Sequence, residues 1–230
     1  MFGDKRWYLF TLFGHAVYLT PSFLFILILF VGMNVRTAQE LAVGLLWVPV
    51  LFLSILLHEL GHAFASDRLG YGKSQIMFWG LGGVAINRFA GQRSPKKSIL
   101  VSLAGPAVSL LLAVISGAAL WFTAGGLSST NLGTRFLELM CWANAVWAIF
   151  NLLPIYPMDG GQAMRSGLLI ALKNQARATR TTGIISLVVL ALAAIASFML
   201  MKDFFLILLF AYFAYINWKL ITTRQQVQWV

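Results

Sequence analysis

The sequence predicts an all-α polytopic membrane protein, and three features lead to that prediction. Hydrophobic residues make up 60% of the 230-residue chain, whereas soluble domains contain roughly 45 to 50%. Charged residues make up only 10%, against about 25% in soluble domains, which leaves too few polar side chains to cover a surface in water. The apolar residues also gather in runs of about 17 to 25, long enough to cross a bilayer as helices. An ordinary water-soluble enzyme is therefore excluded.

Six apolar runs are predicted to be transmembrane helices. They lie at 16–33, 41–65, 98–124, 136–155, 184–201 and 204–220. Only Lys202 and Asp203 separate the last two runs, so we expect a tight helical hairpin there. Because no linker, low-complexity tract or repeat period divides the chain, we expect one transmembrane domain over residues 1–230.

The basic residues predict how the chain crosses the membrane. The net charge is +10, but Lys and Arg lie between apolar runs and not in one stripe, so nucleic acid is not an expected partner. If the N-terminus is cytoplasmic, six crossings leave only Arg36, Arg135 and Lys202 of the 17 basic residues on the outer side. Lys and Arg concentrate on the cytoplasmic side of membrane proteins. We therefore expect both termini in the cytoplasm and, by default, a prokaryotic plasma membrane.

The segment between the second and third runs is too rich in glycine to be a helix. Residues 70–91 contain a short near-apolar stretch interrupted by Gly80, Gly82 and Gly83, which predicts two short strands that turn at the glycines. Open strand edges cannot face lipid, so we expect a small interfacial β-hairpin. Two roles are open for residues 74–88: to plug the cytoplasmic side of the bundle, or to pair with an unwound substrate segment as an added strand.

Three ionisable residues lie within five positions of the second apolar run, in the sequence His58-Glu59-Leu60-Gly61-His62. Residues i and i+4 share a helix face, so both imidazoles can bind one zinc ion, with Glu59 as the general base. Gly61 keeps the helix surface small for close approach of another helix. Simple hydrogen bonding inside the bundle, or a chance match, is the alternative, and the cost of burying three ionisable groups in a membrane disfavours it.

Asp159 is the candidate third ligand, because a catalytic zinc usually has three protein ligands. It ends the segment Asn151-Leu152-Leu153-Pro154-Ile155-Tyr156-Pro157-Met158-Asp159, in which two prolines are expected to break the fourth helix. With six crossings, the second and fourth helices both run toward the cytoplasm, so the two motifs reach the same side. An aspartate that caps or turns a cytoplasmic loop is the alternative role.

The other candidate ligands are less suitable. Glu40, Glu138 and Asp203 are expected on the outer side, and Cys141 lies about four helical turns before the break. His15 stands alone near the first run and is interpreted as an interfacial histidine. Cys141 is interpreted as a packing residue, and as a lone cysteine it cannot form an intramolecular disulfide.

The two motifs, in this order and on separate helices, resemble the site-2 protease family of intramembrane zinc metalloproteases. Leu81-Gly82-Gly83 and Ala104-Gly105-Pro106 also resemble family features, although Met158 stands where the family more often has leucine. The resemblance implies one Zn²⁺ per chain held by His58, His62 and Asp159. It further implies that Glu59 is the general base and that Asn151 positions substrate or stabilises the oxyanion. We expect a minimal core without a PDZ or CBS domain.

The resemblance also implies the function, which is hydrolysis of peptide bonds within or near transmembrane helices of membrane-tethered substrates. Such a substrate helix must unwind locally, because its backbone groups are already paired. A non-catalytic polytopic protein that binds partner helices through a structural metal site is the alternative, and the presence of Glu59 disfavours it. A transporter is a third possibility, but the chain shows no paired halves with matching broken helices.

Overall fold

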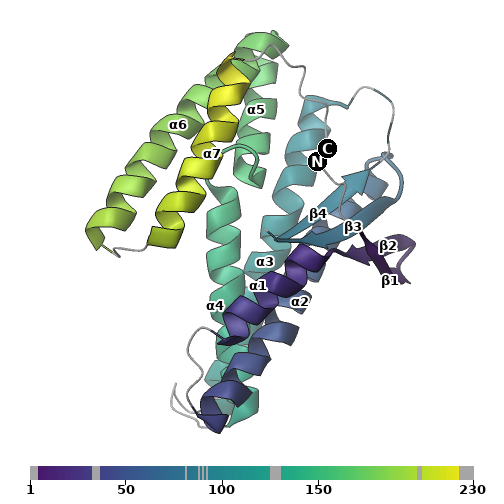
Figure 1. The fold of residues 1–230 in the computed structure, drawn as a ribbon. Coiled ribbons are helices and arrows are strands. Elements are labelled where there is room, and N and C mark those ends of the chain that lie inside the picture. The colour runs from purple at the N-terminus through teal and green to yellow at the C-terminus, as the bar shows by residue number, and fades with distance from the viewer. Residues whose placement is uncertain are drawn as a thin grey trace. The chain divides into compact units, whose positions relative to one another are not determined.

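The computed structural model describes residues 5–32, 37–80, 82–87, 89, 91, 93–124, 131–200 and 204–222. Helices dominate these ranges, and the order of the elements along the chain can be followed in Figure 1. The strands are β1 (Trp7–Leu12), β2 (His15–Leu19), β3 (Ser74–Trp79) and β4 (Gly82–Asn87). The helices are α1 (Pro21–Gly32), α2 (Ala38–Arg68), α3 (Pro95–Ala124), α4 (Leu132–Leu152), α5 (Asp159–Leu172), α6 (Gln175–Leu200) and α7 (Phe204–Thr222).

The chain divides into two compact units, which are described separately below. The first unit contains Met1–Ala90 and Ala104–Ala148, and the second contains Gly91–Leu103 and Ile149–Trp229. The first unit therefore holds the strands, α1, α2 and most of α3 and α4. The second unit holds α5, α6 and α7 with the first part of α3 and the last turn of α4.

Five of the six segments predicted as transmembrane helices are helical, as α2, α3, α4, α6 and α7, and the six crossings themselves stay a prediction. Three described segments are long and apolar enough to cross a membrane, namely Glu40–Arg68, Pro95–Phe122 and Gln175–Met199. A shorter apolar helix covers Leu206–Thr222. The composition and these helices identify a membrane protein. The turn expected at Lys202 and Asp203 lies outside the described residues.

The helix predicted from residue 16 is wrong in its first part, because residues 15–19 form strand β2. The helix that follows begins at Pro21, a residue whose fixed φ suits the first helical position and whose ring favours an extended residue before it. The α1 helix has 12 residues, or about 18 Å at 1.5 Å per residue. Apolar composition alone does not distinguish a buried strand from a helix in so short a stretch.

The predicted β-hairpin is confirmed and is part of a larger sheet. β3 and β4 pair in antiparallel register, from Ser74 opposite Asn87 to Trp79 opposite Gly82. β1 and β2 form a second antiparallel pair, and β2 joins β3 in parallel, which gives the order β1-β2-β3-β4. The parallel pair is possible because α1 and α2 lie between these two strands in the sequence and provide the crossover.

The core of the first unit is built where the sheet meets α1 and α2. Phe78 of β3 is fully buried, stacks on Phe52 of α2 with centroids 4.9 Å apart, and lies 5.0 Å from the ring of Phe23 in α1. Ile76 and Val17 extend this cluster along the neighbouring strands. This packing fixes α2 against the sheet, and α2 carries the histidine motif.

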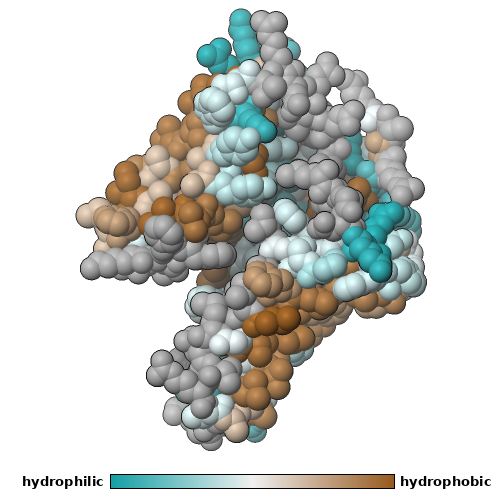
Figure 2. All heavy atoms as spheres, in the orientation of Figure 1, coloured by the Kyte–Doolittle hydropathy of each residue, from teal (hydrophilic) through white to brown (hydrophobic). Residues whose placement is uncertain are grey.

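In the second unit, α6 and α7 pack against each other, and the outer surface of α6 is largely apolar (Figure 1, Figure 2). Leu190 of α6 and Phe210 and Phe213 of α7 are buried between them. Along α6, one stripe of large apolar side chains is exposed, and it consists of Ile184, Val188, Leu192, Ile195 and Phe198. A soluble monomer rarely exposes such a stripe, whereas a helix that faces lipid requires one.

Candidate metal centre

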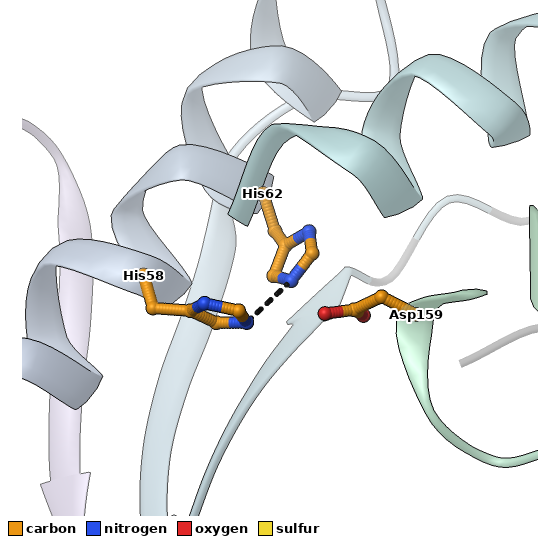
Figure 3. A group of neighbouring side chains, drawn as sticks. All are labelled: His58, His62 and Asp159. Carbon is orange, nitrogen blue, oxygen red and sulfur yellow. Dashed lines mark hydrogen bonds between the residues drawn. The ribbon is translucent and has the colours of Figure 1, made fainter. Parts of the chain in front are cut away.

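His58 and His62 lie one turn apart on the same face of α2, as their spacing predicts. Their Nε2 atoms are 3.2 Å apart, and their ring planes are nearly perpendicular (Figure 3). Two ligands of a tetrahedral zinc at about 2.05 Å from the metal would be about 3.3 Å apart. His58 is 2% exposed, and His62 is partly buried. The pair is therefore preorganised at the separation that one zinc ion requires.

Helix α3 supports the histidine pair from the side. Ser109, which is fully buried, places its Oγ 2.9 Å from Nδ1 of His58. This contact occupies the ring nitrogen that faces away from His62, so it orients the His58 ring and leaves Nε2 directed toward His62. Ser109 was not predicted from the sequence; its only signal is a hydroxyl residue four positions after Gly105, on the same face of α3.

Two glycines allow α2 and α3 to come this close. A Cβ on Gly105 of α3 would lie only 2.3 Å from Nε2 of His62 and 2.8 Å from Nε2 of His58. A Cβ on Gly61 of α2 would lie 2.8 Å from the carbonyl oxygen of Ala104. The expectation that Gly61 permits close helix approach is confirmed. Gly105 lies well inside α3, which begins at Pro95.

Glu59 is buried beside the hairpin. It is 5% exposed, and a Cβ on Gly83 of β4 would lie 2.6 Å from its Cγ and 2.7 Å from its Oε1. The side chain therefore runs directly against the backbone of β4, where only glycine leaves enough room. Leu81, which belongs to the same glycine-rich motif, lies outside the described residues.

Asp159 is the first residue of α5, and Figure 3 shows its carboxylate at the start of that helix. The fourth helix ends at Leu152, before the two prolines expected to break it and three residues before its predicted end at residue 155, and α5 itself was not predicted. The N-cap of α5 is Met158, so the alternative role of Asp159 as the helix cap is wrong. Asp159 is 8% exposed, and its negative charge suits the amino end of a helix.

Asn151 lies in the last turn of α4 and is partly buried. Its predicted role in substrate positioning stays a prediction, as do the assigned roles of the three candidate ligands and Glu59. Glu40 is exposed at the start of α2, where it completes a capping box with Thr37. Glu138 forms an ion pair with Arg135 at 2.6 Å on α4.

His15 is buried in the sheet, and its interpretation as an interfacial histidine stays a prediction. It is fully buried in β2, and its Nδ1 accepts the backbone N–H of Ser74 at 3.1 Å. Burial lowers the pKa of His15, because the interior disfavours the charged imidazolium. Cys141 is a free, partly buried thiol whose Sγ lies beside Gly117 of α3, which is consistent with packing.

The fold and the histidine pair together define a helical membrane protein with a metal-binding motif, and comparison with known proteins places it in a family. The family model described as Peptidase family M50 matches residues 47–134 and 127–196. These residues make up more than half of the chain. The chain belongs to Peptidase family M50.

Two relatives and one solved structure extend the comparison. Zinc metalloprotease MJ0392 of Methanocaldococcus jannaschii is 28% identical over 159 residues, which are 69% of this chain and 44% of MJ0392. Rip3 of Mycobacterium tuberculosis is 32% identical over 148 residues, which are 62% of this chain and 37% of Rip3. The aligned part is thus less than half of either relative. The site-2 protease structure from M. jannaschii matches with a TM-score of 0.63 and 24% identity, covering 98% of this chain and 99% of that one, and shows the shared fold.

Proposed function

We propose that this protein is an intramembrane zinc metalloprotease that hydrolyses peptide bonds within or near transmembrane helices of its substrates. One observation carries the proposal: two imidazoles on an apolar, membrane-length helix converge at the spacing of two zinc ligands, with a buried glutamate between them. A purely structural metal site has no use for that glutamate. Membership of Peptidase family M50 supports the same function.

His58, His62 and Asp159 are the proposed ligands of one zinc ion per chain. Each of these side chains offers one nitrogen or oxygen atom that could bind a metal. Two imidazole nitrogens and one carboxylate oxygen are a donor set that zinc enzymes use, with a further position open for water or substrate. The zinc metalloprotease name of MJ0392 supports this choice of metal.

The chemistry is divided among the buried side chains of this chain. A bound zinc supplies a Lewis acid that makes water nucleophilic near neutral pH. Glu59 accepts the proton of the attacking water and donates it to the leaving amine, while the new C–O bond forms and the C–N bond breaks. The Asn151 amide donates a hydrogen bond to substrate or to the oxyanion. Ser109 holds the His58 ring in its ligating orientation.

The proposed membrane topology has six crossings, by the segments that contain α1, α2, α3, α4, α6 and α7, with both termini and the active site toward the cytoplasm of a prokaryotic cell. The distribution of Lys and Arg supports it. The test is labelling of single cysteines placed at Asn131 and Lys173 in a Cys141→Ser background. Only the Lys173 position should react from the cytoplasmic side, and the reverse result would refute the topology.

The proposed substrate is a transmembrane helix of a membrane-tethered protein, which must unwind before cleavage. β4 is an edge strand of the sheet and lies beside Glu59 at Gly83, so an extended substrate segment that paired with β4 would run close to the general base. Two separate variants, Val84→Pro and Ala85→Pro, test this role. Alternate residues point their N–H groups away from β3, so one of the two variants should slow cleavage while zinc content stays unchanged. If neither does, the hairpin is only a plug.

The decisive experiment compares wild type with Glu59→Gln in purified, detergent-solubilised protein. Zinc content is measured by mass spectrometry, and cleavage is measured on a solubilised transmembrane substrate. We expect one zinc per chain in both proteins and cleavage only by wild type. His58→Ala serves as the control that should lose both. Equal cleavage by wild type and Glu59→Gln would refute the role of Glu59, and absence of zinc from wild type would favour the non-catalytic alternative.

A further inference from the structure

The loop that precedes Asp159 is embedded in the second unit. Residues 153–158 connect α4 to α5, and two of them, Ile155 and Met158, are buried against Leu190 of α6 and the apolar residues of α7. A buried loop leaves backbone N–H and C=O groups without water, so each of them needs a partner within the protein. The source of these partners determines how firmly the loop is held.

Side chains of two different helices bind both backbone groups of Tyr156. Its N–H donates to Oγ of Ser186 in α6 at 3.0 Å, and its carbonyl oxygen accepts from Nδ2 of Asn217 in α7 at 2.5 Å. The Ser186 hydroxyl in turn donates to the carbonyl oxygen of Pro154 at 3.3 Å. The loop is therefore held at its middle by one polar side chain from each helix.

Both side chains are fully buried. The second hydrogen of the Asn217 amide group bonds the carbonyl oxygen of Phe213, one turn earlier, at 2.9 Å. An amide placed in a membrane helix is costly unless it is hydrogen-bonded, so such a residue signals a specific role. The role that the contacts indicate is fixing the loop.

The backbone between Tyr156 and Asp159 is tightly constrained. The N–H of Met158 donates to the carbonyl oxygen of Ile155 at 2.9 Å, which closes a tight turn. A Cβ on Gly160 would lie 2.2 Å from the carbonyl oxygen of Leu152, and a Cβ on Gly161 would lie 2.4 Å from that of Ile155. The start of α5 is thus pressed against the loop backbone, and a shift of Tyr156 must move Asp159.

We propose that Ser186 and Asn217 are positioning residues that fix the Asp159 carboxylate and thereby set the zinc affinity of the site. Neither residue touches the reacting atoms; each acts through the backbone of Tyr156. Partners of this kind typically change metal affinity by about 10 to 100-fold when they are removed. The inference rests on the proposed zinc site.

The test is a double-mutant cycle on the full chain in detergent, with zinc affinity measured by competition against a chromophoric chelator. Ser186→Ala and Asn217→Leu should each weaken zinc binding by about tenfold or more. In an Asp159→Asn background, where the ligand is already lost, the same substitutions should change zinc affinity by less than about twofold, because coupled residues are not additive.

Two control variants separate positioning from general destabilisation. Ser197→Ala removes another buried hydroxyl from α6, one without a hydrogen-bond partner in the described part of the chain, and should leave zinc affinity unchanged. Asn144→Leu removes a buried amide that donates to Ser54 and to the Met140 carbonyl. Thermal unfolding of Asn144→Leu calibrates how much stability such a loss removes.

The outcomes distinguish the two proposals. The inference is supported if wild type binds zinc, if Ser186→Ala and Asn217→Leu each bind zinc more weakly, and if the same substitutions cause no further loss of zinc affinity in the Asp159→Asn background. Unchanged affinity in both variants, or an equal loss in the Asp159→Asn background, overturns it while the zinc site stands. Failure of wild type to bind zinc refutes the proposed function and this inference with it.

Discussion

Replacing Gly105 with alanine tests the packing of α3 against the histidine pair. The new Cβ would lie 2.3 Å from Nε2 and 2.6 Å from Cε1 of His62, and 2.8 Å from Nε2 of His58. Ordinary contacts of a Cβ begin at 3.4 Å, so the closest approach is too short by about 1 Å. Either the imidazoles move or α3 moves away from α2.

The size of the effect follows from the tolerance of metal bonds. Zinc–ligand distances hold within about 0.2 Å, so an imidazole displaced by about 1 Å no longer ligates in the same geometry. Removal of supporting residues lowers metal affinity by about 10 to 100-fold, and loss of a ligand position belongs at the upper end. We expect zinc to bind at least about 100-fold more weakly, which is about 2.7 kcal/mol.

The assay is zinc competition against a chromophoric chelator, paired with thermal unfolding. Gly117→Ala in the same helix and Gly167→Ala in α5 are matched controls, because a Cβ meets Cys141 at 3.4 Å in the first and nothing within 4 Å in the second. Both controls should keep wild-type zinc affinity. Their free energy of unfolding should rise by about 0.5 to 1 kcal/mol, because alanine replaces glycine inside a helix. Wild-type affinity in Gly105→Ala would refute the packing argument.

Three further predictions concern other parts of the first unit. Ser109→Ala should weaken zinc binding by about tenfold, because the His58 ring loses its Oγ contact; an unchanged affinity in the chelator assay would contradict this. Phe78→Ala should lower the free energy of unfolding by about 3 to 5 kcal/mol, since the ring is fully buried between Phe52 and Phe23, and denaturation in detergent measures it. Burial lowers the pKa of His15, so the unfolded chain takes up this proton at higher pH, and stability should fall as pH drops below about 6.5. His15→Gln should flatten that decline in thermal unfolding between pH 7.5 and 5.5, and an equally steep decline would contradict the assignment.

The helices and the histidine motif were predictable because their signals are local. A long apolar run or an i, i+4 pair of histidines is determined by neighbouring residues in the sequence. Asp159 was reached because two prolines mark the end of α4. In contrast, β2 was predicted as helix because Val17 and Leu19 suit a buried strand and a membrane helix equally well, and only pairing with β3 decides between them.

The supporting residues were not predictable for the same reason. Ser109 acts across two helices, at a separation of 51 residues from His58. Asn217 binds a backbone carbonyl 61 residues earlier in the chain. A single serine or asparagine in an apolar run indicates that some partner exists but does not identify it, because the partner is determined only when the helices pack.

The parallel pairing of β2 with β3 has a consequence for biosynthesis. His15 and Ser74, which meet at the start of this pair, are 59 residues apart. A growing chain therefore displays the β1–β2 hairpin, with one edge of β2 unsatisfied, through the whole synthesis of α1 and α2. The sheet can close only after the membrane-length α2 has been made and β3 has left the ribosome, so sheet assembly requires complete synthesis of the helix that bears the histidines.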